Sequence, residues 1–175
     1  MGNIFHPSAV KLIVAMITNS LSLLPEVENL LQKKFGPIDF HSPIIDFTYT
    51  NYYEKEMGKN LKRKFVSFEK LIFPLEIITI KHYTNRLERK FSHQGRRNIN
   101  LDPGYLNEGK LILVSTKDNL QRIYLGKGIY GEVTLYFKHA EFQPFMWTYP
   151  DYRSPEYRHI FKQIRNIFRK QIGKE

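Results

Sequence analysis

Apolar residues form an almost unbroken run over residues 9–17, where Lys11 is the only charged side chain. A continuous apolar run of this length is typical of a strand that is buried on both faces of a sheet, because neither face then needs polar residues. The run therefore predicts a central, buried strand close to the start of the chain.

Helical spacing of apolar residues predicts three helices, over residues 23–35, 74–92 and 155–172. Ser22 as a cap and Pro25 in the first turn are typical of a helix start. The pair Gly36-Pro37 is typical of a helix end. The first helix therefore has a signal at both of its boundaries.

The last helix has the clearest start, because Ser154 is a favourable cap and Pro155 suits the first helical position. An apolar stripe runs along one side of it and basic residues lie mostly on the other. This pattern indicates a helix docked on the sheet with a solvated basic face. Binding to a membrane surface is the alternative.

Short β-rich segments fill much of the remaining chain. Residues 38–50 predict one strand interrupted at Pro43, whereas residues 51–73 fit either a strand or a helix. Three segments separated by turns predict an antiparallel meander, at residues 111–118, 121–128 and 131–138. We therefore expect a single α+β domain over residues 1–175, with a mixed, mostly antiparallel sheet and three main helices packed on it.

Composition restricts the class of protein further. The 175 residues include no cysteine, which excludes disulfides and thiolate metal sites. No apolar stretch is long enough to span a membrane and no signal peptide is evident, so we expect a cytoplasmic protein. The net charge of +10 favours a phosphate-bearing or polyanionic partner such as a nucleotide or RNA, although solubility alone also accounts for it. Oligomeric state is not indicated.

A glycine-rich segment at residues 126–133 reads G-x-G-x-x-G-x-V and contains Lys127. In protein kinases, a loop with the same pattern covers the phosphates of ATP, but the other kinase motifs are missing from this chain. A dinucleotide-binding loop is excluded because a strand follows the glycines where a helix is required. The segment is more typical of a tight β-hairpin turn.

A second polar cluster precedes and includes an Asp-Pro-Gly sequence, which is turn chemistry. Two adjacent guanidinium groups beside two amides could hold a phosphate or carboxylate, and the alternative is an exposed basic turn. The candidate binding residues here are Arg96, Arg97, Asn98, Asn100 and Tyr105, and Asp102 is a candidate acid or base.

Two further clusters combine aromatic and charged residues. Residues 46–56 place Asp46 and Glu56 around a run of tyrosines, which fits a polar pocket wall or an aromatic patch beside an acidic loop. Residues 147–153 place Trp147, Tyr152 and Arg153 together, which fits stacking on a base or packing of the last helix.

Glu132 follows the glycine-rich turn, and Arg122 and Tyr124 precede it. If the hairpin closes at residues 127–130, Glu132 becomes a neighbour of Arg122 or Tyr124 on one polar face. A structural ion pair accounts for this arrangement. The functional alternative adds Arg97 and Asp102 to the same face, which gives one site with charges of both signs.

The six histidines are scattered without metal-ligand spacing, and no serine lies in a G-x-S-x-G motif. We therefore expect no metal site and no nucleophile elbow. The residues indicate no particular cofactor.

Four of these blocks, DFTYTNYYEKEMGKNLKRKFVSFEKL, RRNINLDPGY, RIYLGKGIYGEVTLYF and WTYPDYRS, resemble a prokaryotic family known as domain of unknown function 4416. Some members carry the label GTP-binding protein, but this chain has no phosphate loop and no guanine-reading motif. The family tends to have aspartate, histidine and alanine where Asn51, Gln121 and Gly131 stand here. These differences argue against a base or metal ligand at position 51 and a general acid at position 121, and they make the third glycine incidental.

Three functions fit these observations. The first is a module that binds a phosphate-bearing ligand, nucleotide or RNA, on a basic, aromatic-lined face. The second is an enzyme acting on a phosphorylated small molecule, in which Asp46, Glu56, Asp102 or Glu132 supplies the acid or base and the arginines clamp the phosphate. The third is a protein-interaction module that uses the last helix. Convergence of the polar clusters on one concave pocket favours the enzyme.

Overall fold

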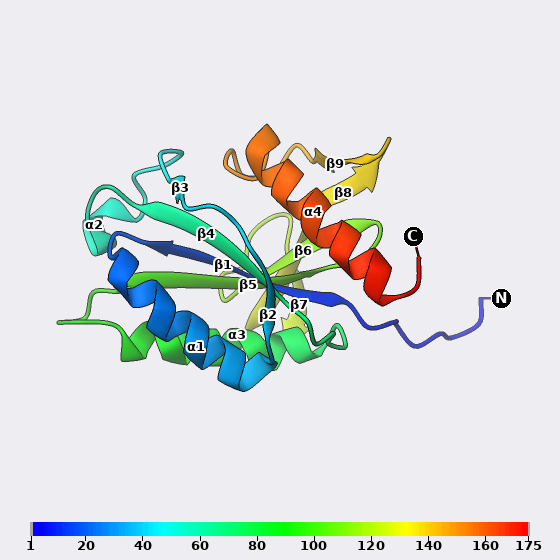
Figure 1. Ribbon diagram of the computed structural model, residues 1–175, viewed down its shortest axis with the longest axis horizontal. Helices are drawn as coiled ribbons and strands as arrows, with labels where there is room; N and C mark the ends of the chain where they lie inside the picture. The colour runs from blue at the N-terminus through cyan, green and yellow to red at the C-terminus, as the bar shows by residue number, and fades with distance from the viewer. Residues whose placement is uncertain (1, 175) are drawn as a thin grey trace.

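A computed structural model describes residues 2–174 of the chain and is shown in Figure 1. The helices and their bounds, in chain order, are the 3-10 helix η1 (Leu21–Leu23), α1 (Leu24–Phe35), α2 (Glu54–Met57), α3 (Glu76–Lys90) and α4 (Pro155–Gln171). The strands are β1 (Lys11–Thr18), β2 (Ile38–His41), β3 (Ile45–Asp46), β4 (Lys62–Phe68), β5 (Ile99–Leu106), β6 (Lys110–Ser115), β7 (Ile123–Gly126), β8 (Ile129–Lys138) and β9 (Glu141–Pro144).

All nine strands belong to one sheet in which every pairing between them is antiparallel. The strand order is β2-β4-β1-β5-β6-β8-β7, with β3 beside β4 and β9 beside β8. The predicted α+β class with three main helices is confirmed, and so is the position of β1 near the centre, where all eight of its residues are buried.

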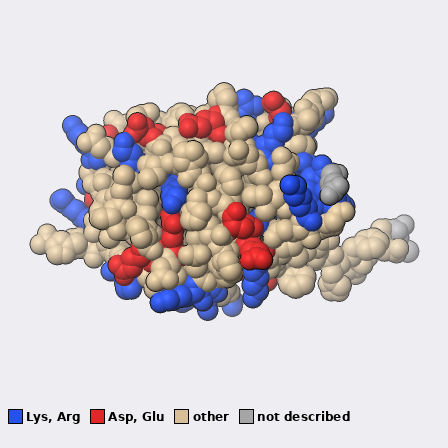
Figure 2. Space-filling view, viewed as in Figure 1, with Lys and Arg blue, Asp and Glu red and all other residues tan. Residues whose placement is uncertain are grey.

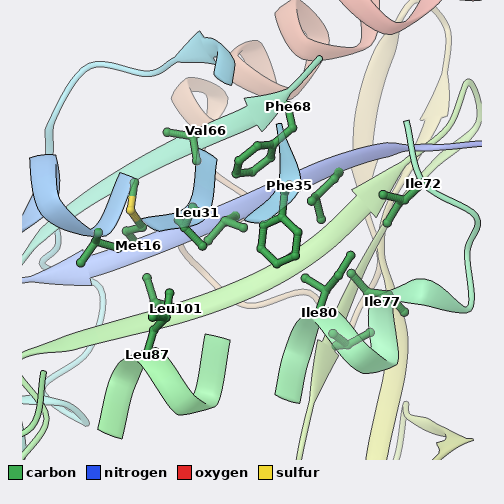
Figure 3. Close-up of a cluster of buried hydrophobic side chains, with 14 of the residues drawn as sticks. Met16, Leu31, Phe35, Val66, Phe68, Ile72, Ile77, Ile80, Leu87 and Leu101 are labelled. Atoms are coloured by element: carbon green, nitrogen blue, oxygen red, sulfur yellow. The ribbon is translucent and has the colours of Figure 1, made fainter. Parts of the chain in front are cut away.

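The two faces of β1 belong to two apolar cores on opposite sides of the sheet. Leu12, Val14 and Met16 pack with α1 and α3 on one side, as Figure 3 shows for Met16. Ile13 and Ala15 pack with α4 on the other side. Alternation of side chains along a strand thus explains why the run has no polar face. In Figure 1, α1 and α3 lie below the sheet and α4 lies above its right-hand part.

The predicted helices are present, with small changes at their starts. Leu23, and not Ser22, is the N-cap of α1, because η1 occupies the preceding turn and Ser22 lies within it. Gly36 ends α1 with a positive φ of 96°, as expected for a glycine stop. At α4, the predicted cap is confirmed, because the side chain of Ser154 accepts a hydrogen bond from the backbone N–H of Tyr157.

Two predictions about strands are wrong. The Asp102-Pro103-Gly104 sequence is not a turn but the middle of β5, because its pairing with β1 over the whole strand outweighs local turn preference. The C-terminal strands do not form a simple meander, because β8 lies between β6 and β7. The segment 38–50 does break around Pro43, and the ambiguous segment 51–73 contains α2 and then β4.

The glycine-rich segment forms the β7–β8 hairpin turn. Gly126, Lys127 and Gly128 all have positive φ angles, of 116°, 52° and 75°. Glycine is favoured in such turns because it adopts positive φ without steric cost. The hairpin interpretation is therefore confirmed. In the described part of the chain, no helix is long and apolar enough to cross a membrane.

Candidate functional site

A cavity of about 640 Å³ lies where β5 and β6 separate. The two strands pair only through residues 104–106 of β5, so the first half of β5 has no strand on that side. The cavity wall is built by the following segments and side chains: Phe47, Tyr49, Thr50, Tyr52, Tyr53, Arg63 of β4, Lys81, Asn85 and Glu88 of α3, Arg97, Asn100, Asp102, residues 113–119, Arg122, Glu132 of β8 and residues 149–152.

Local chemistry explains why β6 leaves β5 at this point. Pro103 has no N–H to donate, so it cannot continue the ladder. Gly104 allows the last close approach, because a Cβ at this position would lie 2.4 Å from the carbonyl oxygen of Ile112. On the N-terminal side of Gly104, side chains of α3 replace β6 as the hydrogen-bonding partners of β5. The N–H of Leu101 donates to Glu88 Oε1 at 2.6 Å, and its carbonyl accepts from Lys81 Nζ at 3.1 Å.

Asp102 lines the cavity with its side chain 30% exposed. One carboxylate oxygen accepts from Lys81 Nζ at 3.3 Å and the other from Asn100 Nδ2 at 2.6 Å. Burial opposes ionisation of this carboxyl, but the positive charges of Lys81 and Arg63 outweigh it and hold the pKa of Asp102 below its ordinary value. Asp102 is therefore a carboxylate that stays ionised and remains accessible from the cavity.

At Glu88, in contrast, burial has a larger effect on the pKa than the neighbouring cations. Its side chain is 9% exposed, and burial raises its pKa above the ordinary value although Lys81 and Arg97 oppose the shift. The negative charge of Asp102 adds to the upward shift. One cavity thus contains two neighbouring carboxyl groups whose pKa values are moved apart, an arrangement that suits one of them as a base and the other as an acid.

Arg97 ties three parts of the chain together beside these carboxyl groups. Its Nε and Nη2 each donate to the Glu56 carboxylate at 2.7 Å, and its Nη1 donates to Asn100 Oδ1 at 2.8 Å and lies 3.4 Å from Glu88. Hydrogen bonding by Arg97 lowers the pKa of Glu56. All three nitrogens of Arg97 are engaged, so this residue positions its neighbours and has little capacity left for a ligand anion.

Arg122 and Glu132 form a second ion pair on the cavity wall, with Arg122 Nε donating to Glu132 Oε2 at 2.9 Å. Arg122 also donates to the Lys117 carbonyl and to the hydroxyl of Tyr149, at 2.8 and 3.0 Å. The predicted contact between Glu132 and Arg122 is thus present. Arg97 and Asp102 line the same cavity, which is the arrangement that the functional alternative requires.

Arg63 also lines the cavity and is buried among aromatic rings. Its guanidinium carbon lies 4.9–5.9 Å from the ring centres of Phe47, Phe65, Tyr152 and Tyr157. Its Nη2 donates to Asp151 at 2.9 Å. Burial raises the pKa of Asp151 even beside this cation. The pair and the ring cage hold β4 against the segment that leads into α4.

Lys117 differs from the other four cations of the cavity wall, because it makes no ion pair within the described residues. Its ammonium group donates to the hydroxyl of Tyr52 and lies 4.9 Å from the centre of that ring. Both side chains are exposed. Lys117 therefore offers a positive charge that an incoming anion can reach without breaking an existing salt bridge.

Six of the predicted site residues line the cavity, namely Arg97, Asn100, Asp102, Arg122, Glu132 and Tyr152, and Glu56 binds one of them. The others lie outside it. Asp46 is exposed and paired with Lys62, Arg96 is exposed, and Lys127 lies in the hairpin turn.

The remaining four outlying residues have structural contacts. Asn98 donates to the Phe91 carbonyl, and Tyr105 packs against the α1–α3 core. Trp147 stacks on Phe145 and donates to the Val133 carbonyl, and Arg153 donates to the carbonyls of Thr148 and Met146. These contacts explain the residues without a ligand.

Sequence reasoning missed Arg63, Lys81, Glu88, Lys117 and Asp151. A signal existed for the two residues of α3, since Lys81 and Glu88 lie four residues after Ile77 and Thr84 on the face that the apolar pattern assigns to the core. Arg63 lies two residues before Phe65, which would have indicated a buried cation if β4 had been assigned as a strand. The sequence carried no signal for Lys117.

Five basic and five acidic side chains line the cavity: Arg63, Lys81, Arg97, Lys117 and Arg122, against Glu88, Asp102, Asp118, Glu132 and Asp151. The surplus positive charge of the chain therefore lies elsewhere. No group of three or more His, Cys, Asp or Glu side chains in residues 2–174 is arranged to hold a metal ion.

Comparison with known proteins gives one match. Neither the curated proteins nor the solved structures contain a match to this chain. The sequence model of the family described as Domain of unknown function (DUF4416) matches residues 8–168, which include every side chain that lines the cavity. The chain therefore belongs to the DUF4416 family.

Proposed function

We propose that the protein is an enzyme that acts on a small phosphorylated molecule bound in the cavity between β5 and β6. The observation that carries the proposal is the presence of Glu88 and Asp102, with pKa values shifted in opposite directions, in one concave site. The other polar groups of that site come from segments that are distant from one another in the sequence.

Asp102 acts as the general base in this proposal and Glu88 as the general acid. Asp102 is ionised and accessible, and Lys81 and Asn100 fix the orientation of its carboxylate. Glu88 is fixed by its hydrogen bond from Leu101, and burial raises its pKa, which makes it the better proton donor of the two. A positioned acid or base contributes about 10²–10⁴-fold to a rate, so Asp102→Asn lowers kcat by a factor in this range.

Lys117 is the docking point for the phosphate group. A phosphate that approached any of the other four cations would compete with a carboxylate that already holds it. The Ser115 and Thr116 side chains belong to the same stretch of cavity wall and offer hydroxyl donors. A nucleotide fits the phosphorylated class because exposed rings of Tyr49, Tyr52 and Tyr149 lie on the wall and offer stacking surfaces.

The equal numbers of basic and acidic side chains on the cavity wall argue against RNA as its ligand, because a polyanion requires a surplus of cations along its path. The buried apolar stripe of α4 argues against an interaction module built on that helix. Its side chains form the core on one face of the sheet, so α4 is part of the fold.

Titration of inorganic phosphate by calorimetry tests the docking point. We expect binding to the unmodified protein, a loss of about tenfold or more in affinity for Lys117→Ala, and no change for Lys33→Ala. Lys33 is exposed on α1, so the control changes the net charge equally without touching the cavity. Equal losses in the two variants would show that phosphate responds only to net charge, and the proposed site would be wrong.

A further inference from the structure

Glu132 has an unused hydrogen-bond acceptor in the wall of the cavity. Its side chain is 2% exposed, and its Oε1 has no hydrogen-bond partner among the described residues. Its other oxygen, Oε2, accepts from both Gln121 Nε2 and Arg122 Nε, at 3.0 and 2.9 Å. Two donors thus share one oxygen of this carboxylate while the second oxygen remains without any.

The orientation of this carboxylate is fixed by its surroundings. Arg122 is held from two other sides, by the Lys117 carbonyl and the Tyr149 hydroxyl, so it has no freedom to reach Oε1. A buried acceptor without a donor lowers the stability of a fold, and native structures retain few such groups. Because Glu132 belongs to the cavity wall, a bound molecule is the natural source of the missing donor.

We propose that Glu132 Oε1 accepts a hydrogen bond from an amino group of the substrate, and that the substrate is therefore a phosphorylated amine. This inference rests on the proposed function, in which Lys117 receives the phosphate. A protonated amine supplies both an N–H donor and a positive charge, and hydrogen bonds between charged groups are stronger than neutral ones. A molecule with charges of both signs also matches a wall that carries both basic and acidic side chains.

Glu132→Gln is a conservative probe of this role. The side-chain oxygen of glutamine keeps an acceptor for Gln121 and Arg122, while its amide nitrogen replaces Oε1 and presents donors where the proposal requires an acceptor. The matched control is Glu26→Gln, which removes the same charge from an exposed side chain of α1, outside the cavity wall. Glu26 pairs with Lys90 on the surface, and exposed pairs of this kind contribute little to stability.

The test compares O-phosphoethanolamine with ethyl phosphate, which differ only in the amino group, by calorimetric titration of the full chain. We expect phosphoethanolamine to bind the unmodified protein and Glu26→Gln about tenfold more tightly than ethyl phosphate. In Glu132→Gln the two affinities become similar, through weaker binding of the amine.

The possible outcomes separate the two proposals. Equal affinity of both compounds for the unmodified protein would overturn the role of Glu132 and leave phosphate binding intact. Failure of both compounds to bind would contradict the proposed function, and the inference would fall with it. The comparison on the unmodified protein decides the question even if Glu132→Gln does not fold.

Discussion

At the scale of single residues, the backbone of Leu101 shows how the candidate site is built into the fold. Its N–H and carbonyl face a side of β5 that has no strand, and Glu88 and Lys81 satisfy them. Buried backbone groups are rarely left unpaired, so these two contacts stabilise β5 where β6 has left it. The same two side chains line the cavity, and the fold therefore fixes the proposed acid in position.

The raised pKa of Glu88 predicts a pH-dependent difference between the unmodified protein and Glu88→Gln. Because the folded state disfavours ionised Glu88, its folded pKa lies above the ordinary value of 4.5. The unmodified protein therefore loses stability relative to the variant as the pH rises from 4.5 through the folded pKa of Glu88. Thermal unfolding of both proteins over this range measures the difference. Parallel curves would contradict the raised pKa.

Two glycines of the sheet, Gly104 of β5 and Gly131 of β8, predict different results for the same change. Gly104→Ala places a methyl group against the backbone of Ile112, at 2.4 Å from its oxygen, so we expect a loss of about 1–3 kcal/mol in stability. Gly131→Ala meets only the flexible side chain of Leu125, at 2.9 Å, so we expect less than about 1 kcal/mol. Chemical denaturation measures both, and equal losses would show that the close approach at Gly104 is not required.

At the scale of elements, long patterns of apolar residues correctly predicted the strand and the helices that contain them. Residues 9–17 and the three helices are present nearly as predicted. β5 was missed because Asp102-Pro103-Gly104 carries strong local turn chemistry, whereas the preference for a strand comes from pairing with β1, more than 80 residues earlier in the chain. β9 was missed because it is short and depends on its pairing with β8.

The candidate site was also predicted only where its residues form a local pattern in the sequence. Arg97, Asn100 and Asp102 were found because they lie close together in the sequence. Arg63 and Asp151 are separated by 88 residues, and only the packing of α4 on the sheet brings them together. Pairs of this kind leave no local pattern, so one chain without its relatives gives no indication of them.

The burial of α4 predicts the result of removing it. Deletion of residues 155–175 exposes the apolar core on that face of the sheet, where Phe161 and Ile164 are almost fully buried. We expect the shortened chain to lose cooperative unfolding, because burial of apolar surface is the main stabilising contribution to a fold. Differential scanning calorimetry measures this. A truncated protein that still unfolds cooperatively would show that α4 is an appended helix.

At the scale of the whole molecule, the net charge of +10 does not come from the cavity wall, which has equal numbers of basic and acidic side chains. In Figure 2, Lys and Arg side chains are spread around the outline of the molecule, with a group along the lower edge where α1 and α3 lie. The outer surface therefore carries the positive field, which attracts anions without selecting among them.

The separation of the basic outer surface from the cavity predicts how substitutions in the cavity change the affinity for RNA. Any affinity for single-stranded RNA at low salt should fall steeply as salt is added, because it arises from the outer surface. Lys117→Ala should weaken it no more than Lys33→Ala does. Fluorescence anisotropy with a labelled oligonucleotide measures both variants. A selective loss in Lys117→Ala would place RNA at the mouth of the cavity and contradict the small-molecule proposal.

The cavity between β5 and β6 is proposed to bind a phosphorylated small molecule through Lys117. The most direct measurement is a crystal structure of the protein grown with O-phosphoethanolamine. We expect the phosphate within hydrogen-bond distance of Lys117 Nζ and the amino group within hydrogen-bond distance of Glu132 Oε1. A cavity that contains only water, with phosphate bound solely on the outer basic surface, would contradict it.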